Sequence, residues 1–428
     1  MGQKFHHRHF NAAIAGVAAA MSLLVGRWSP GRLFDVAWQS YAGIDLSILL
    51  QPRHWLLPIL LLTVLPLRIL RVPARLSSPI RRRNHLFNLM ACLFVYLILS
   101  TAWASQTDLA LAKAYELIIV FGTIAAIVAW MNSQQAALFL HWFWLSITAF
   151  TGFLACMAFL SLTTETRLSV LGGGPNVFGR LMFLFAIGSL ALIRQSNLLR
   201  LSICAAAMAL VILSGSRGAM LSSVVGFTVY AFATQGRLSS RATAFFGITA
   251  CGIVISMTPV GDLVFKTFSD RIIHLTFEQR YTSGREELLQ AAWELWKQSP
   301  IIGNGVSGWE TQHHVGLSFE STYPHNLCLE LLCEGGLIAL TLFLLIIAQF
   351  LRFLTRNRTK LHAPSVAATA MFLIASQFSG DFFDSRGVFF CLVIAPGVLQ
   401  LPTTCRIQSK HLTESARPIQ TVFATPPT

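Results

Sequence analysis

The chain has 428 residues, of which 54% are hydrophobic and only 12% are charged, and its formal net charge is +14. Soluble domains have about 25% charged residues, so this composition excludes an ordinary soluble enzyme. It indicates an all-α, polytopic integral membrane protein surrounded by membrane lipid. The positive charge has no basic soluble face on which to gather, which excludes nucleic-acid binding.

Apolar runs that are long enough, or nearly long enough, to cross a bilayer recur along the chain. We predict twelve transmembrane helices near residues 11–26, 55–70, 86–104, 110–131, 136–160, 177–193, 199–213, 219–234, 242–258, 327–350, 363–379 and 387–400. Several of these runs are shorter than about 20 residues, so their ends extend into flanking polar residues, or two of the runs are re-entrant.

The positions of Lys and Arg predict the orientation of these helices, because both residues collect on the cytoplasmic side. With Lys4 and Arg8 in the cytoplasm, alternate turns such as 68–83 and 352–360 carry arginines, whereas the opposite turn 105–109 carries none. We therefore expect both termini to be cytoplasmic, with the first apolar run retained as a signal anchor.

The chain then divides into four segments: helices 1 to 9 in residues 1–258, an extracytoplasmic loop in 259–325, helices 10 to 12 in 326–400 and a cytoplasmic tail in 401–428. The loop is too long for a simple connector, which indicates a function. Within it, Ser283-Gly-Arg-Glu286 has the form of a capping box. The pattern that follows predicts an amphipathic helix ending before Pro300.

His325 is the leading candidate for catalysis. It lies in Pro324-His325-Asn326, directly before the apolar run 327–350. A polar group at a membrane boundary is costly unless it has partners or a function, and a histidine can accept or release a proton near neutral pH. We predict that His325 is catalytic; the alternative is a structural histidine. The substrate-binding candidates of the same region are Arg280, Arg285, His314 and Asn326.

A turn on the same predicted side of the membrane contains Gly215-Ser216-Arg217-Gly218. The glycines allow the backbone to approach a ligand closely. The Ser216 hydroxyl and the Arg217 guanidinium suit phosphate oxygens, so we predict that both bind an anion. The alternative for Arg217 is a side chain that reaches lipid headgroups.

A second turn on that side carries three glycines at 172–174 between Arg167 and the pair Asn176 and Arg180. We interpret it as a shaped loop that approaches a ligand, with these three polar residues as further substrate-binding candidates. The alternative is a flexible turn followed by a helix that begins at Asn176.

Glu330 and Glu334 follow His325 at a spacing that places both on one face of a helix. Buried carboxylates need partners, so we expect the two to support the arginines or to orient His325. Lys113 and Glu116 are expected to form another buried pair. No DxD or ExD pattern occurs, and the histidines at 313–314 have no acidic partner at a fixed spacing. We therefore expect neither a metal ion nor a cofactor.

Four motifs together resemble the O-antigen ligase and O-antigen polymerase superfamily over roughly residues 160–350. They are Ser216-Arg217-Gly218, the helix 285–296, Pro300-x-x-Gly303-x-Gly305 and Pro324-His325-Asn326, in this order and on one face. The resemblance implies a metal-independent glycosyltransferase of the bacterial inner membrane, with an active site that faces the periplasm. It also implies that the superfamily's arginines fall on Arg217 and Arg285, and its histidine on His325.

The implied donor is a glycan on undecaprenyl diphosphate. Arg217, Arg285 and Ser216 would bind the diphosphate and stabilise its charge as it leaves. His325 would accept the proton of an acceptor hydroxyl, and the anomeric centre would invert. For a ligase of lipopolysaccharide biosynthesis, that hydroxyl belongs to the lipid A core.

Two alternatives stay open. A polymerase of the same superfamily would instead extend a growing O-antigen or exopolysaccharide by repeat units. A transporter of lipid-linked glycans would need alternating access, internal repeats or half-helices, and the sequence has no visible internal repeat.

Overall fold

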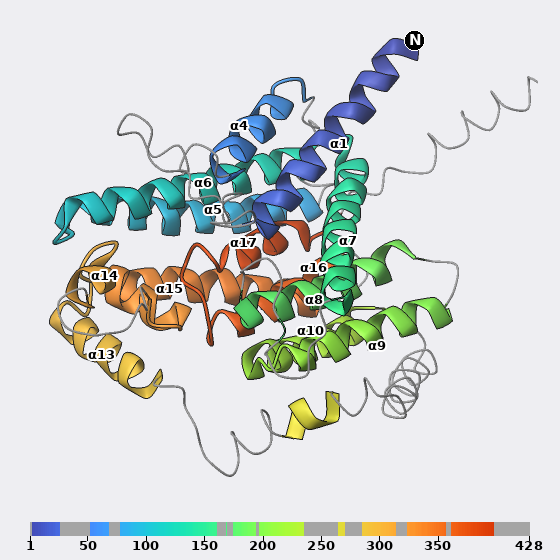
Figure 1. The fold of residues 1–428 in the computed structure, drawn as a ribbon. Helices are drawn as coiled ribbons and strands as arrows, with labels where there is room; N and C mark the ends of the chain where they lie inside the picture. Colours follow the sequence, from blue (N-terminus) through green and yellow to red (C-terminus); the bar gives the residue numbers. More distant parts are fainter. Residues whose placement is uncertain are drawn as a thin grey trace, which may run out of the picture.

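A computed structural model describes residues 2–25, 52–67, 78–160, 168, 174–193, 197–234, 264–269, 285–313, 323–356 and 361–397. The regular elements in these ranges are helices (Figure 1), which confirms the all-α class. Five of the described helices are long and apolar enough to cross a membrane, and four shorter ones are apolar. The total of twelve spans stays a prediction, and the predicted span 242–258 lies outside the described residues.

The helices that carry the argument below are α1 (Gly2–Leu24), α4 (Pro52–Val64), α5 (Ser78–Leu99), η1 (Ser100–Trp103), α6 (Thr107–Met131), α7 (Ala136–Leu160), α8 (Gly174–Leu192), α9 (Asn197–Leu213), α10 (Arg217–Ala233), α13 (Arg285–Gln298), α14 (Gly308–His313), α15 (Leu327–Arg356), α16 (Ala363–Ala375) and α17 (Arg386–Ile394). In Figure 1, α5, α6 and α15 run side by side, and α8, α9 and α10 form a neighbouring group. Between these groups lie α16 and α17, with α13 and α14 beside α15.

Helix α17 is short and lies in the core, where all nine of its residues are buried. Nine residues at 1.5 Å each extend about 14 Å, roughly half of a bilayer core. The Phe389 ring packs edge-on against Phe94, with 5.3 Å between their centroids. Helix α17 therefore covers only part of the predicted span 387–400, whose crossing of the membrane stays a prediction.

One end of the bundle is closed by Arg83, which is 1% exposed. Its guanidinium donates to the carbonyl of Val393 at 2.8 Å, to the carbonyl of Met131 at 3.0 Å and to Oδ1 of Asn132 at 2.7 Å. The start of α5 thus meets the ends of α6 and α17. A buried guanidinium is tolerated here because backbone carbonyls satisfy its donors.

Helix α15 is broken at Gly336, which corrects the prediction of one continuous span over 327–350. Gly336 has φ 61° and ψ −161°. The loop 300–305 fills the break: Leu337 N–H donates to the Pro300 carbonyl at 2.9 Å, and Gly305 N–H donates to the Glu334 carbonyl at 3.0 Å. Groups left unpaired at the two helix ends are satisfied in this way. Segment 327–335 is thus a separate short helix.

Glycines make this joint possible. A Cβ on Gly303 would collide with the backbone of Glu334, and a Cβ on Gly336 would collide with the carbonyl of Ile301. Both glycines have positive φ, which other residues rarely adopt. The Pro300-x-x-Gly303-x-Gly305 motif therefore has a structural role at the break in α15.

Helix α13 confirms the predicted amphipathic helix, since it begins at Arg285 and ends at Gln298, before Pro300. Its inner face buries Ala292 and Leu295 in a small cluster with Trp309 and Cys333. Trp293 remains 46% exposed. The helix therefore packs on α15 and keeps one tryptophan at the surface.

Candidate functional site

The turn between α16 and α17, residues 376–385, joins segments that are far apart in the sequence. Leu327 N–H, at the start of α15, donates to the Ser376 carbonyl at 3.0 Å. A Cβ on Gly218, in the first turn of α10, would lie 2.9 Å from Cβ of Phe378. The segments that carry Arg217 and His325 therefore both contact this α16–α17 turn.

The first two turns of α8 also contact the α16–α17 turn. Arg180 is 9% exposed and donates to the carbonyls of Ser379 at 2.7 Å and Ala375 at 3.2 Å. One helical turn earlier, Asn176 Nδ2 donates to the Ser379 hydroxyl at 3.1 Å. Arg180 and Asn176 thus hold the α16–α17 turn in place. Both were predicted to bind substrate, and the contacts that the structure shows for them are with this turn.

Ser216 forms the N-cap of α10 and is 2% exposed. Its hydroxyl accepts from Ala219 N–H at 3.2 Å and donates to Oδ1 of Asn176. A serine cap of this kind satisfies a helix N–H that has no partner within the helix. Arg217 follows as the first residue of α10, at the partly positive end of the helix. It is half-buried.

His325 is half-buried and adopts a left-handed backbone with φ 57°. Histidine is among the residues that tolerate this region, and a backbone held there costs about 1–3 kcal/mol. The ring lies edge-on to Tyr323, with centroids 4.5 Å apart. Asn326 then caps α15, because its Oδ1 accepts from Leu329 N–H at 3.0 Å. The backbone of His325 is thus fixed between a turn and a helix cap.

The carboxylates of Glu330 and Glu334 share one cation. Lys113 Nζ, from α6, lies 2.7 Å from Oε1 of Glu330 and 2.6 Å from Oε1 of Glu334. The three residues are between 1% and 6% exposed. The expectation that both glutamates need partners is confirmed. The partner expected for Lys113 was wrong, since Lys113 reaches across to α15 and Glu116 accepts instead from Arg53 of α4.

Several predicted ligands cannot be placed. The backbone of Arg285 begins α13, but its side chain lies outside the described part of the chain, as do Arg167, Arg280 and His314. Their convergence on His325 therefore stays a prediction. Among the side chains that the structure describes, no group of three or more His, Cys, Asp or Glu residues is arranged to hold a metal ion.

The α16–α17 turn is the part of the site that sequence reasoning missed. The predicted spans 363–379 and 387–400 place Ser376 at the end of a span and Asp381 in a connector, yet both residues are at most 2% exposed in the structure. The sequence did contain a signal, because Ser379-Gly380-Asp381 is a polar run between two apolar runs. In the structure, Gly380 has φ 86°. Glycine with positive φ next to buried polar residues is typical of a shaped turn.

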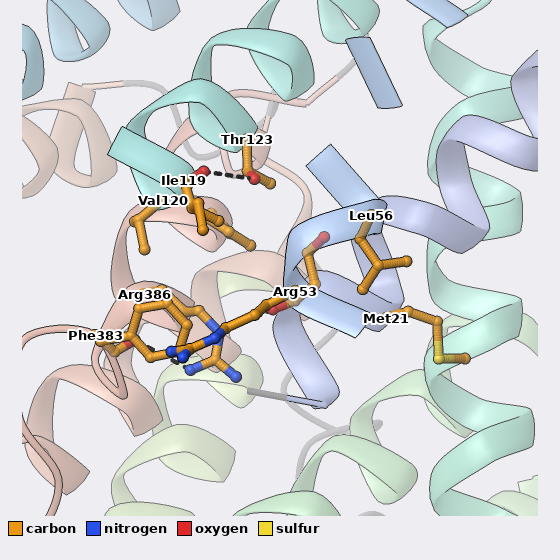
Figure 2. A pocket seen from close by; sticks show the side chains of 10 residues that line it. Met21, Arg53, Leu56, Ile119, Val120, Thr123, Phe383 and Arg386 are labelled. Carbon is orange, nitrogen blue, oxygen red and sulfur yellow. Dashed lines mark hydrogen bonds between the residues drawn. The ribbon is translucent and has the colours of Figure 1, made fainter. Parts of the chain in front are cut away.

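A pocket that includes Phe383 of this turn contains none of the predicted ligands. It lies between α1, α4, α6 and α17 (Figure 2), with Arg53 and Arg386 beside Phe383. The guanidinium carbon of Arg386 is 4.7 Å from the Phe383 ring centre, and that of Arg53 is 5.9 Å from it. Arg386 also donates to the carbonyls of Ser22 and Leu23, each at 2.8 Å. We therefore interpret the pocket as the place where Arg386 holds the C-terminal end of α1 against α17.

Comparison with known proteins agrees with the motifs. Residues 201–344 match the family model described as O-Antigen ligase. The chain is also similar to the teichuronic acid biosynthesis protein TuaE of Bacillus subtilis (strain 168), with 24% identity over 347 residues, which is 71% of this chain and 69% of that protein. The resemblance to the O-antigen ligase and polymerase superfamily is thus confirmed. The matched region includes Arg217, Arg285 and His325.

Proposed function

We propose that this chain is a membrane glycosyltransferase that moves a glycan from undecaprenyl diphosphate to an acceptor hydroxyl. The observation that carries the proposal is the shared contact at the α16–α17 turn, where Gly218 packs on Phe378 and Leu327 N–H donates to Ser376. Arg217 and His325 adjoin these contacts in sequence. Glycosyl transfer from a diphosphate needs a cation and a proton acceptor of this kind in one region.

In the proposed mechanism, the acceptor oxygen attacks C1 of the donor sugar as the bond from C1 to the phosphate oxygen breaks. His325 takes the proton from the acceptor hydroxyl. Arg217 and Arg285 stabilise the charge that develops on the leaving diphosphate. Each begins a helix, where the dipole and the free N–H groups add to the attraction for an anion. Attack opposite the leaving group inverts the anomeric centre, and the scheme uses neither a metal nor a cofactor.

The buried polar contacts fit this mechanism as supports. Asn176 and Arg180 hold the α16–α17 turn, and Asn326 caps the helix that follows His325. The Ser216 hydroxyl already forms hydrogen bonds with Asn176 and Ala219. We therefore propose that Ser216 fixes the start of α10, in place of the predicted contact with the diphosphate. Reacting groups need this kind of fixed geometry for an effective transfer. Arg167, Arg280 and His314 are proposed to contact the diphosphate or the glycan.

We place the site on the periplasmic side of the inner membrane, within the loop 259–325 and the adjoining helix ends. The support is the end of the bundle that Arg83 closes. This end adjoins the basic turns in the sequence, and basic turns belong in the cytoplasm. We therefore assign the site to the opposite end. Both termini, with the tail 401–428, are then cytoplasmic, and the membrane helices occupy 1–258 and 326–400.

The preferred acceptor is a hydroxyl of the lipid A core, as in a ligase, because the matching family model is that of O-Antigen ligase. The second candidate is a polymerase that joins repeat units. The similarity to TuaE favours it, since that protein is named for the biosynthesis of teichuronic acid and not for ligation.

The test uses the purified full chain in lipid nanodiscs with a glycan on undecaprenyl diphosphate. One reaction contains lipid A core and the other contains only more donor. Release of undecaprenyl diphosphate with glycosylated core supports the ligase, and release with longer lipid-linked glycans supports the polymerase. A donor that stays intact with both acceptors, in protein that binds it, would overturn the proposal and favour a transporter.

A further inference from the structure

Lys113 of α6 forms ion pairs with both Glu330 and Glu334 of segment 327–335. We infer that Lys113 is a positioning residue for His325: by binding Glu330 and Glu334 it fixes the short helix that begins directly after the Pro324-His325-Asn326 turn. The inference rests on the proposed function, in which His325 accepts the acceptor proton.

The short helix depends on its surroundings for its position. An isolated helix of nine residues is not stable in water, and the break at Gly336 separates it from the long remainder of α15. Its start is held by Leu327 N–H on Ser376, and its end by Asn304 N–H on the Cys333 carbonyl at 2.9 Å. These contacts fix the two ends of the helix axis.

Rotation about that axis is fixed by the side chains. Glu330 and Glu334 are one turn apart on one face. A single ammonium group within 2.7 Å of both carboxylates therefore sets which face turns toward α6. Because Asn326 caps this same helix, a rotation would be passed directly to the backbone of His325.

The charges make this contact hard to replace. The negative charges of Glu330, Glu334, Glu310 and Asp381 all attract the Lys113 ammonium group. Without the ammonium, the buried carboxylates of Glu330 and Glu334 would have no cation between them. Removal of one partner from a buried ion pair is strongly destabilising, so the short helix would turn to bring its carboxylates to water.

The experiment compares three variants of the full chain in nanodiscs. Lys113→Met removes the ammonium, and the double variant Lys113→Glu/Glu330→Lys restores one cation between two carboxylates. Lys297→Met is the matched control, because Lys297 pairs with Glu294 on the exposed face of α13, where such pairs contribute little. Each variant is assayed for transfer kinetics and for the rate at which diethyl pyrocarbonate modifies His325, measured by mass spectrometry.

We expect Lys113→Met to lower kcat about 100-fold with little change in the donor KM, the size expected when a reacting group is misplaced by about 1 Å. The modification rate of His325 should change several-fold. The charge exchange should recover both quantities in large part, and Lys297→Met should leave both unchanged.

A wild-type kcat for Lys113→Met would overturn the inference. So would an unchanged modification rate of His325, or a loss of kcat in Lys113→Met that merely follows the loss of folded protein and is not recovered by the charge exchange. If the wild-type chain itself transfers nothing, the proposed function fails. The modification rates then still decide whether Lys113 positions His325.

Discussion

The hydroxyl of Ser216 donates to the side chain of Asn176, 40 positions earlier in the chain. The same amide donates from Nδ2 to the hydroxyl of Ser379 at 3.1 Å. One asparagine thus connects the N-termini of α8 and α10 with the α16–α17 turn. Buried polar groups that are satisfied in this way specify one arrangement of the segments that hold them.

The first prediction concerns Asn176. Asn176→Ala should lower the free energy of unfolding by about 1–3 kcal/mol, because the Ser216 and Ser379 hydroxyls both lose a partner. Ser379→Ala removes only one of these two bonds and should cost less. Thermal unfolding of both variants in detergent measures the difference. Equal losses would mean that the bond between Asn176 and Ser216 contributes nothing.

The second prediction concerns His325. Substitution by alanine would add backbone strain at φ 57°, so His325→Asn is the better variant, since asparagine tolerates the left-handed region. We expect His325→Asn to lower transfer by about 10²–10⁴-fold, the usual contribution of a general base. Binding of the lipid-linked donor should persist, since a base acts mainly in the transition state. Transfer at the wild-type rate would return His325 to the structural alternative.

The third prediction concerns Arg285, the first residue of α13. Arg285→Ala should weaken donor binding and lower kcat, because diphosphate charge is present in the bound donor and grows as it leaves. Arg285→Lys should recover only part of both, since an ammonium keeps the charge but loses the guanidinium fork. Donor-binding and transfer assays on the same preparations separate the two effects. Lys297→Ala, at the other end of the same helix, is the control and should match the wild type.

Local features of the structure could be predicted from the sequence. The amphipathic pattern and the proline at 300 predicted α13, because both concern residues next to one another in the chain, whereas the predicted capping box at Ser283 lies outside the described residues. The need of Glu330 for a partner was likewise visible in its apolar surroundings.

Long-range pairings could not be predicted in this way. Asn176 and Ser379 are 203 positions apart, and Lys113 and Glu330 are 217 positions apart. Periodicity reports only neighbours within a few turns, which is why Glu116 was expected as the partner of Lys113. The break at Gly336 was hidden for a related reason: an apolar run with two glycines has the composition of an ordinary span, and the loop that fills the break comes from about 30 residues earlier in the chain.

The fourth prediction concerns pH. His362 caps α16, accepting from Ser365 N–H, and burial lowers the pKa of its imidazole from 6.5 to about 4. The unfolded chain therefore binds this proton more readily, so stability should fall as the pH drops from about 6.5 toward 4. His362→Asn keeps a capping oxygen but does not titrate. Unfolding temperatures of the two proteins across this range should diverge as the pH falls. Parallel curves would exclude His362 as a source of the pH dependence.

The last prediction concerns the joint at the break in α15. Gly336→Ala adds a Cβ that collides with the Ile301 carbonyl at a backbone with φ 61°. The matched control is Gly174→Ala, because Gly174 has a similar φ of 71° but no atom of the described residues lies within 4 Å of its Cβ position. Strain alone should cost the control about 1 kcal/mol of unfolding free energy.

The collision adds to this strain at Gly336, so we expect Gly336→Ala to unfold at a clearly lower temperature and to lose transfer, since the short helix after His325 would shift from the loop 300–305. Thermal unfolding and transfer assays of both variants measure the two effects. If Gly336→Ala and Gly174→Ala lose the same stability, then only backbone strain matters at this joint, and the docking of loop 300–305 has no part in holding the short helix.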